Sequence, residues 1–232
     1  MGASLQNQTV VVIGGGAGIG AAVGALAKAE GARVVTISRS GAAASGMEAI
    51  AADVNDRSAL AAALKGVGAI DHLVHTAGAR LGSTRLAVLD EDALPLAFGA
   101  KLFSAVHAIR LSLPYLSANA SVTLTSGQVS RKYGAGSLVK GAVNAAVEAA
   151  GKHLAKELAP RRVNVVSPGV VDTGLWGEPG SDARSAVIER VSAALPVQRV
   201  GAPEELAGAY LFAMTNGFVT GSVIDVDGGG LL

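Results

Sequence analysis

The feature that most constrains the fold is a glycine-rich turn near the N-terminus, Gly14-Gly15-Gly16-Ala17-Gly18-Ile19-Gly20. It follows the β-branched run Thr9–Ile13 and leads directly into an Ala-rich stretch, Gly18–Glu30. Glycine lets a backbone turn sharply and approach a diphosphate closely. A helix N-terminus then offers unpaired amides and the positive end of its dipole to an anion. The pattern predicts a dinucleotide-binding strand–turn–helix, with a flexible glycine loop as the alternative.

The rest of the chain alternates short β-branched runs with longer helical stretches. Apolar strands joined by helices are typical of a parallel sheet buried on both faces. We therefore predict one domain over residues 1–232, of α/β class, with a three-layer Rossmann fold and a doubly wound parallel sheet of about seven strands. The expected strands are Thr9–Ile13, Arg33–Ser38, Glu48–Ala52, His72–His75, Ser121–Thr125, Arg162–Ser167 and Ser222–Asp225. The expected helices are Gly18–Glu30, Arg57–Lys65, Ala93–Leu116, Ser137–Leu158 and Pro203–Ala213.

Two connections depart from this alternation. Only RSGAAASG separates the second strand from the third, so the second crossover is predicted to be abbreviated. The stretch Gly174–Arg190 shows no regular pattern and could form a flexible lid. Trp176, within it, could close over a substrate or pack on the lid's own apolar residues.

Composition narrows the class of function. The chain has no cysteine, which excludes disulfides, thiolate catalysis and Cys-ligated metals, and no metal site is expected. A net charge of +1 with interspersed signs gives no support for nucleic-acid binding. Neither a signal peptide nor an apolar run of ~18 residues is evident, so no membrane span is expected. These features indicate a cytoplasmic protein that acts on a small molecule.

The end of the second strand distinguishes NADP from NAD. In a Rossmann unit an acidic residue at this position binds the adenosine ribose 2′-hydroxyl, whereas a nearby arginine suits a 2′-phosphate. Here Ser38 stands at the acidic position and Arg39 follows it. A guanidinium can bind a phosphate with two hydrogen bonds, so NADP is predicted and NAD is less favoured. The alternative is that Arg39 is an ordinary surface arginine.

The spacing Gly-x-x-x-Gly-x-Gly resembles the short-chain dehydrogenase/reductase family, and the resemblance extends over nearly the whole chain. It implies a homodimer or homotetramer built on the helices Ala93–Leu116 and Ser137–Leu158. His75 takes the place of a family Asn and is expected to be structural. The cofactor-binding residues that the resemblance and the turn imply are Gly14, Gly16, Ala17, Gly18, Ile19, Gly20, Ser38, Arg39, Asp53, Val54, Thr76, Ala77, Gly78, Lys140, Pro168, Gly169, Val171 and Thr173.

The catalytic pattern of the family is only partly present. Members use Ser, Tyr and Lys, with an Asn that completes a proton relay, and the Tyr precedes the Lys by four residues on one helix. Ser126 and Lys140 match the Ser and the Lys. Counting back from Lys140 gives Gly136 instead of Tyr, and Lys101 falls at the Asn position. The chain between Ser126 and Lys140 is also shorter than is usual in the family.

Two residues are candidates for the missing proton donor. Tyr133 precedes Lys140 by seven residues, in a glycine-rich stretch that could fold back towards Ser126. Lys101 would lie near a second lysine and the oxidised nicotinamide, which would lower its pKa towards neutrality. The sequence thus predicts an NADP(H)-dependent oxidoreductase of a small carbonyl, alcohol or imine with a non-standard proton donor. The alternative is a non-catalytic NADP(H)-binding sensor or oligomer partner.

Overall fold

A seven-stranded parallel sheet forms the centre of the molecule, in the order β3-β2-β1-β4-β5-β6-β7. The computed structural model describes residues 4–42, 46–78, 81–178 and 180–232. The order reverses between β1 and β4, as in a doubly wound sheet, so the predicted fold class is confirmed. The strands are β1 Thr9–Ile13, β2 Arg33–Ser38, β3 Glu48–Ala51, β4 Ile70–His75, β5 Leu116–Thr125, β6 Arg162–Pro168 and β7 Val223–Val226.

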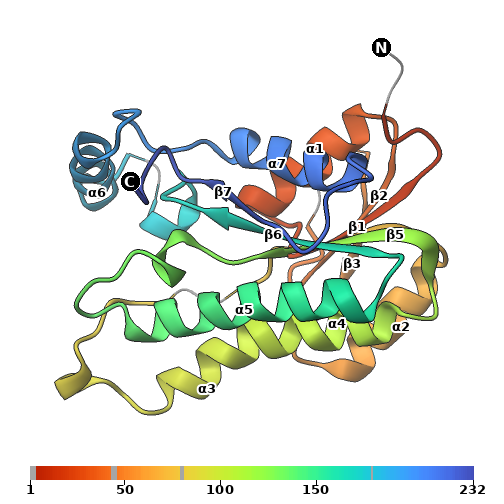
Figure 1. Ribbon diagram of the computed structural model, residues 1–232, viewed down its shortest axis with the longest axis horizontal. Helices are drawn as coiled ribbons and strands as arrows, with labels where there is room; N and C mark the ends of the chain where they lie inside the picture. The colour runs from red at the N-terminus through yellow and green to blue at the C-terminus, as the bar shows by residue number, and fades with distance from the viewer. Residues whose placement is uncertain (1–3, 43–45, 79–80, 179) are drawn as a thin grey trace.

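Helices cover both faces of the sheet and complete the three layers (Figure 1). On one face α1 (Gly18–Ala29) packs beside α7 (Pro203–Thr215). The other face carries α2 (Arg57–Val67), α3 (Ala93–Phe98), α4 (Ser104–Ser112) and α5 (Leu138–Glu157). A further helix, α6 (Asp182–Ala194), lies at one end of the molecule.

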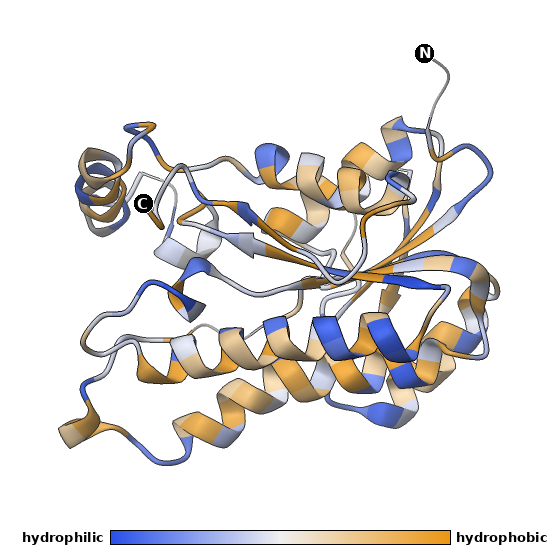
Figure 2. Ribbon diagram, in the orientation of Figure 1, coloured by the Kyte–Doolittle hydropathy of each residue, from blue (hydrophilic) through white to orange (hydrophobic). Residues whose placement is uncertain are grey.

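Alternation along the strands divides the core in two. Val11 and Ile13 of β1 are fully buried beneath α2, α4 and α5, whereas Val10 and Val12 are fully buried beneath α1 and α7. Successive side chains of a strand point to opposite faces, so an unbroken β-branched run supplies both cores. Figure 2 shows the apolar strands at the centre of the molecule.

The predicted helix Ala93–Leu116 extends four residues too far. The helix is interrupted by a π-helical segment, Gly99–Phe103, and α4 ends at Ser112. Strand β5 then begins at Leu116, five residues before its predicted start at Ser121. Leu116 pairs with Ile70 of β4, so tertiary pairing overrides the low strand propensity of the Asn- and Ala-containing stretch that follows. The other predicted ends differ from the structure by at most two residues.

The second half of the predicted lid is a helix. The 3-10 turn Gly174–Trp176 precedes α6, whose first turn is capped by Ser181. Sequence periodicity did not indicate this helix, because its apolar residues do not form one stripe. The crossover between β2 and β3, by contrast, contains no helix within the described residues 39–42 and 46–47, in agreement with the predicted abbreviation.

One helical stretch, 93–112, is long and apolar enough to cross a membrane by length and composition. It comprises α3, the π-helical segment and α4, and it packs beside α2 and α5 on the sheet. Such packing is typical of a helix in a folded α/β domain, and the same criteria are met by core helices.

We expect two buried histidines to make the fold sensitive to acid. Burial lowers the pKa of both His72 and His75 to about 4, and the nearby Lys101 charge also lowers that of His75. Below pH 6.5 the unfolded chain binds protons that the folded chain does not, so the free energy of unfolding falls as the pH drops from 6.5 towards 4. The loss is on the order of 3 kcal/mol for each histidine.

Urea unfolding of wild type and a His75→Gln variant at a series of pH values measures this dependence. The variant is expected to lose less stability than wild type between pH 6.5 and 4.5, whereas a substitution of the exposed His153 leaves the slope unchanged. Parallel slopes in wild type and His75→Gln would contradict the assignment to His75.

Candidate active site

The glycine-rich turn lies between the carboxyl ends of β2 and β4. Gly14 has φ +89°, and a Cβ atom there would lie 2.6 Å from the Ala77 amide nitrogen. A Cβ on Gly16 would lie 2.9 Å from Ser38 Oγ. The N-cap residue Ala17 supplies no side-chain hydrogen bond to the first turn of α1. The turn is therefore a close-packed cradle that presents helix amides, which fits the diphosphate of a dinucleotide.

Other predicted cofactor residues gather at the same edge of the sheet. Thr76 Oγ1 donates to the Ile13 carbonyl at 3.1 Å, joining the ends of β4 and β1. A Cβ on Gly18 would lie 3.5 Å from Thr173 Cγ2, so the segment after β6 reaches the start of α1. Arg39 is exposed directly after β2. The structure thus brings Gly14–Gly20, Ser38, Arg39, Thr76–Gly78 and Thr173 to the same edge of the sheet, with Asp53 and Val54 following β3.

The segment after β6 is firmly anchored. A Cβ on Gly169 would lie 2.6 Å from Asp227 Cα, and Val171 pairs with Gly201 as an isolated parallel bridge. Trp176 donates from Nε1 to the Val171 carbonyl at 2.8 Å, so the indole is turned onto this segment. Arg184 of α6 pairs with the Asp172 carboxylate at 2.7 Å. The first part of the expected lid is therefore tied to the segment that precedes it.

Lys101 lies in the π-helical segment and is partly buried. Its Nζ donates to the Ser126 carbonyl at 2.8 Å and to Asn144 Oδ1 at 2.5 Å. Burial lowers the pKa of Lys101 to about 8, and the negative charge of Glu148 opposes this shift. Lys101 therefore joins α5 to the carboxyl end of β5.

The Ser126 hydroxyl belongs to a polar network around Glu148 of α5. Ser126 Oγ donates to Glu148 Oε1 at 3.0 Å, and Ser130 Oγ donates to the same oxygen at 2.6 Å. Arg131 lies 3.3 Å from Glu148 Oε2 and donates to Asp225 Oδ2 of β7 at 2.8 Å. Hydrogen bonds and charge from Asp225 and Glu148, opposed by desolvation, raise the pKa of Arg131 above its usual range. A carboxylate thus holds the hydroxyl of the predicted catalytic serine.

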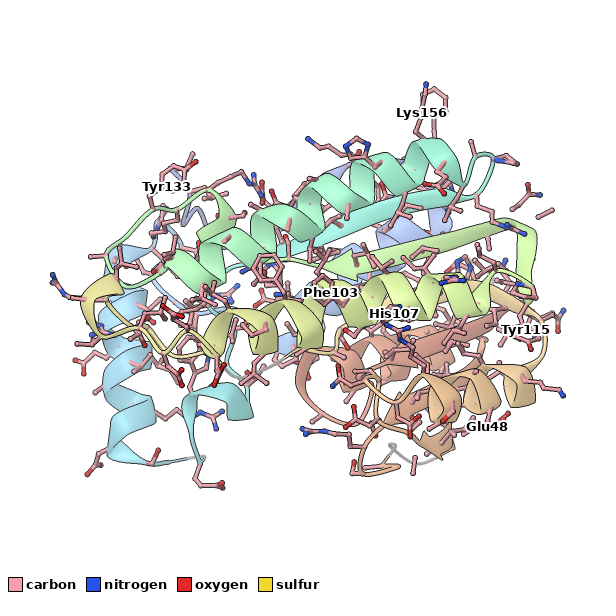
Figure 3. All side chains as sticks on the ribbon, turned by 90° about the horizontal axis from the view of Figure 1, so that it is seen from below. Glu48, Phe103, His107, Tyr115, Tyr133 and Lys156 are labelled. Carbon is pink, nitrogen blue, oxygen red and sulfur yellow. The ribbon has the colours of Figure 1, made fainter. Side chains whose placement is uncertain are left out.

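Lys140 and Tyr133 are not brought together. Lys140 Nζ donates to Ser83 Oγ at 2.8 Å, and burial lowers the pKa of Lys140. Helix α5 begins only at Leu138, so Gly136 lies in the preceding turn with φ +81°. The Tyr133 side chain is 89% exposed and points outward beside α5 (Figure 3). It contributes to a pocket of about 830 Å³ between the 84–87 segment and the start of α5.

Sequence reasoning missed Asn144, Glu148 and Ser83. Asn144 and Glu148 follow Lys140 at intervals of four residues, so Lys140, Asn144 and Glu148 lie near one face of an Ala- and Val-rich helix. This four-residue spacing of polar residues could have indicated that Asn144 and Glu148 belong to the site. Ser83 carries none, because a single serine in a loop is common and its contact is made across 57 residues of sequence.

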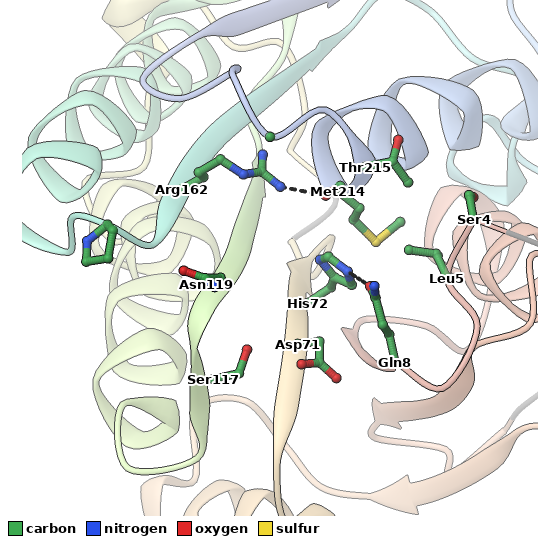
Figure 4. Close-up of a pocket in the computed structure, with 12 residues that line it drawn as sticks. Ser4, Leu5, Gln8, Asp71, His72, Ser117, Asn119, Arg162, Met214 and Thr215 are labelled. Atoms are coloured by element: carbon green, nitrogen blue, oxygen red, sulfur yellow. Dashed lines mark hydrogen bonds between the residues drawn. The ribbon is translucent and has the colours of Figure 1, made fainter.

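A second cavity, of about 420 Å³, lies at the amino ends of the strands (Figure 4). Arg162, at the start of β6, donates to the Ala213 carbonyl at 2.6 Å and so caps the C-terminal turn of α7. His72 lies 2.7 Å from Ser121 Oγ and 2.5 Å from Gln8 Oε1. These polar groups are used within the fold, and ligands of doubly wound sheets bind at the carboxyl ends of the strands instead.

Within the described part of the chain, no cluster of three or more His, Asp or Glu side chains could hold a metal ion.

Comparison with known proteins identifies the family. Residues 14–230 match a family model described as enoyl-(acyl carrier protein) reductase. The chain is 33% identical to the short-chain dehydrogenase/reductase ATR9 of Stachybotrys chlorohalonatus, and the match covers 99% of each protein. The chain belongs to the short-chain dehydrogenase/reductase family.

Two further relatives extend the comparison. The present chain is 31% identical to the cis-1,2-dihydrobenzene-1,2-diol dehydrogenase of Pseudomonas putida, over 97% of this chain and 92% of that protein. It is similar to a crystal structure of a small-chain dehydrogenase in complex with NADPH, with 40% identity, a TM-score of 0.89 and coverage of 97% of this chain and 99% of the other. The resemblance and the predicted oxidoreductase class are confirmed.

We expect Lys101 to impose a measurable alkaline dependence on stability. Between pH 8 and 10.5 the folded chain releases the Lys101 proton while the unfolded chain keeps it, so the free energy of unfolding rises with pH. The rise is on the order of 3 kcal/mol. Denaturant unfolding of wild type and Lys101→Met from pH 7.5 to 10.5 measures it.

The free energy of unfolding of wild type is expected to rise relative to that of Lys101→Met as the pH increases. A Lys132→Met variant, which changes an exposed lysine, serves as the matched control. If the difference in free energy of unfolding between wild type and Lys101→Met stays constant over this pH range, Lys101 does not have the lowered pKa described above.

Proposed function

We propose that the protein is an NADP(H)-dependent oxidoreductase that interconverts a small carbonyl compound, or an imine, with the corresponding alcohol or amine. The observation that carries the proposal is the close-packed glycine cradle at the start of α1, with Arg39 exposed beside it and no carboxylate at Ser38. The bound cofactor would supply the hydride. Ser126 and Lys140, at the carboxyl end of β5 and the start of α5, are the groups assigned to the substrate side.

Preference for NADP(H) follows from the charges at the end of β2. A carboxylate there would repel the adenosine 2′-phosphate, whereas the Arg39 guanidinium can bind it in a bidentate manner. A relative with 40% identity was crystallised with NADPH, which supports the same assignment.

The site residues take different roles in this proposal. Lys140 binds the nicotinamide ribose, and Ser126 orients the substrate oxygen once its hydroxyl, which donates to Glu148 Oε1 in the structure, turns to the substrate. Lys101 is better suited to positioning Ser126 than to donating a proton, since its ammonium is held by the Ser126 carbonyl and Asn144. Tyr133 borders the pocket beside α5 and is assigned to substrate contact rather than to chemistry.

Assembly into a homodimer or homotetramer and a cytoplasmic location complete the proposal. Apolar side chains of the 93–112 stretch are exposed, with Leu96 at 68% and Phe103 at 51%. A row of exposed apolar residues on one helix suits a subunit interface. The absence of cysteine is compatible with a reducing compartment.

The cofactor assignment predicts that Arg39→Ala weakens NADPH binding by about tenfold or more and leaves NADH binding nearly unchanged, because only NADPH carries the 2′-phosphate. Fluorescence titration of both cofactors measures the two dissociation constants. Arg110→Ala, which removes an exposed arginine on the opposite face of the sheet, is the matched control. Tighter binding of NADH than NADPH to wild type would refute the assignment.

The catalytic assignment predicts NADPH consumption with a panel of ketones, aldehydes and imines. Ser126→Ala is expected to reduce kcat by about 100-fold while the dissociation constant of NADPH stays the same. Binding of NADPH with no turnover on any member of a broad panel would instead favour a non-catalytic sensor.

The assembly proposal predicts that Phe103→Asp lowers the oligomeric mass in light scattering, since a carboxylate would be buried without a partner in the interface. Phe103→Leu keeps the apolar surface and is expected to preserve the mass. A monomeric wild-type protein at micromolar concentration would rule out this interface.

A further inference from the structure

Lys140 already has a hydroxyl partner in the structure. Its Nζ donates to Ser83 Oγ at 2.8 Å, although the two residues are 57 positions apart in sequence. Ser83 lies in the segment that follows β4, after the predicted cofactor residues Thr76–Gly78, and it is exposed rather than packed in the core. The lysine that should bind the nicotinamide ribose is therefore paired with a serine from another part of the chain.

The same segment fills the space beside Gly136. A Cβ on Gly136 would lie 3.4 Å from the Thr84 nitrogen and 3.6 Å from the Ser83 carbonyl carbon. The Thr84 amide also donates to the Gly136 carbonyl at 3.0 Å. A side chain at position 136 would thus project against residues 83 and 84. The family pattern has a tyrosine hydroxyl four residues before the lysine. In this chain that position is Gly136, and the segment packed against it carries the Ser83 hydroxyl.

The two residues considered from sequence do not occupy this place. Tyr133 is 89% exposed, and within the described residues its hydroxyl takes part in none of the hydrogen bonds found. Lys101 donates two of its three N–H groups to the Ser126 carbonyl and to Asn144. Ser83 is the hydroxyl in contact with Lys140.

We propose that Ser83 is the proton donor of the reductase, taking the part that the missing tyrosine hydroxyl plays in the family. The inference rests on the proposed function above. In the reductive direction the bound NADPH supplies a hydride to the carbonyl carbon. The Ser83 O–H bond breaks, its proton passes to the carbonyl oxygen, and the electron pair left on Oγ takes a proton from the Lys140 ammonium. Lys140 then recovers a proton from water.

Two physical features favour this arrangement. An aliphatic hydroxyl and the alcohol product are matched in acidity, so the transfer between them is nearly balanced, and the ammonium provides the net proton. An ammonium has three N–H donors, so Lys140 can bind Ser83 and still donate to the ribose hydroxyls. Burial lowers the pKa of Lys140, which makes that proton easier to release near neutral pH.

Substitution of Ser83 tests the catalytic role. Ser83→Ala is expected to lower kcat by about 100-fold and to leave the NADPH dissociation constant within twofold of wild type. Ser83→Thr retains the hydroxyl and is expected to recover at least a tenth of the activity. Ser185→Ala removes an exposed hydroxyl on α6, away from Lys140, and is the matched control, with near wild-type turnover. Full activity of Ser83→Ala, in a wild-type protein that turns over, would overturn the proposal without affecting the proposed function.

A measurement that needs no substrate tests the Ser83–Lys140 contact itself. The chain has no cysteine, so Ser83→Cys introduces a single thiol whose ionisation can be followed by absorbance at 240 nm or by the pH dependence of alkylation. An ammonium in contact should lower the pKa of this thiol by about one unit relative to Thr84→Cys. The added substitution Lys140→Met should abolish the difference. Equal thiol pKa values in Ser83→Cys and Thr84→Cys would show that Lys140 does not act on position 83, and the proposal would fail.

Discussion

The structure depends on close backbone packing where the carboxyl ends of the central strands meet. The turn after β1 passes so near the segment after β4 that Gly14 has no room for a side chain, and Gly14 also requires a positive φ. This packing leaves the first turn of α1 directed at the crevice, where its amides and dipole favour an anion. The positions of Arg39, Thr173 and the β5 end follow from the same geometry, because each lies on an element that contacts this turn or a neighbouring strand.

Near this turn, polar residues of α5 form hydrogen bonds to three other parts of the chain. Lys140 contacts Ser83, Asn144 binds Lys101, and Glu148 binds Ser126. Because Asn144 and Glu148 each have a polar partner, the cost of their desolvation is offset and their orientation is fixed. The site therefore keeps order on its substrate side even though the family tyrosine is replaced by glycine at position 136.

Much of the fold could be predicted from sequence because local rules agree with it. The β-branched runs, the glycine turn and the Ala-rich stretches each indicate one kind of element, and their alternation indicates a doubly wound parallel sheet. The π-helical break at Gly99–Phe103 and helix α6 could not, since the first depends on tertiary packing and the second lacks an apolar stripe. In the candidate site, the glycine turn between β1 and α1 was predictable from its motif. The contacts of Lys101 and Ser83 were not, because each joins residues far apart in sequence and depends on how loops pack.

The central claim is that the bare amides at the start of α1 bind the diphosphate of NADP(H). A crystal structure of the protein with NADPH tests it most directly. We predict diphosphate oxygens within hydrogen-bond distance of the amides that follow Ala17, and the 2′-phosphate beside Arg39. An ordered cofactor bound elsewhere, or a crevice that stays empty at saturating NADPH in solution and in the crystal, would contradict the account.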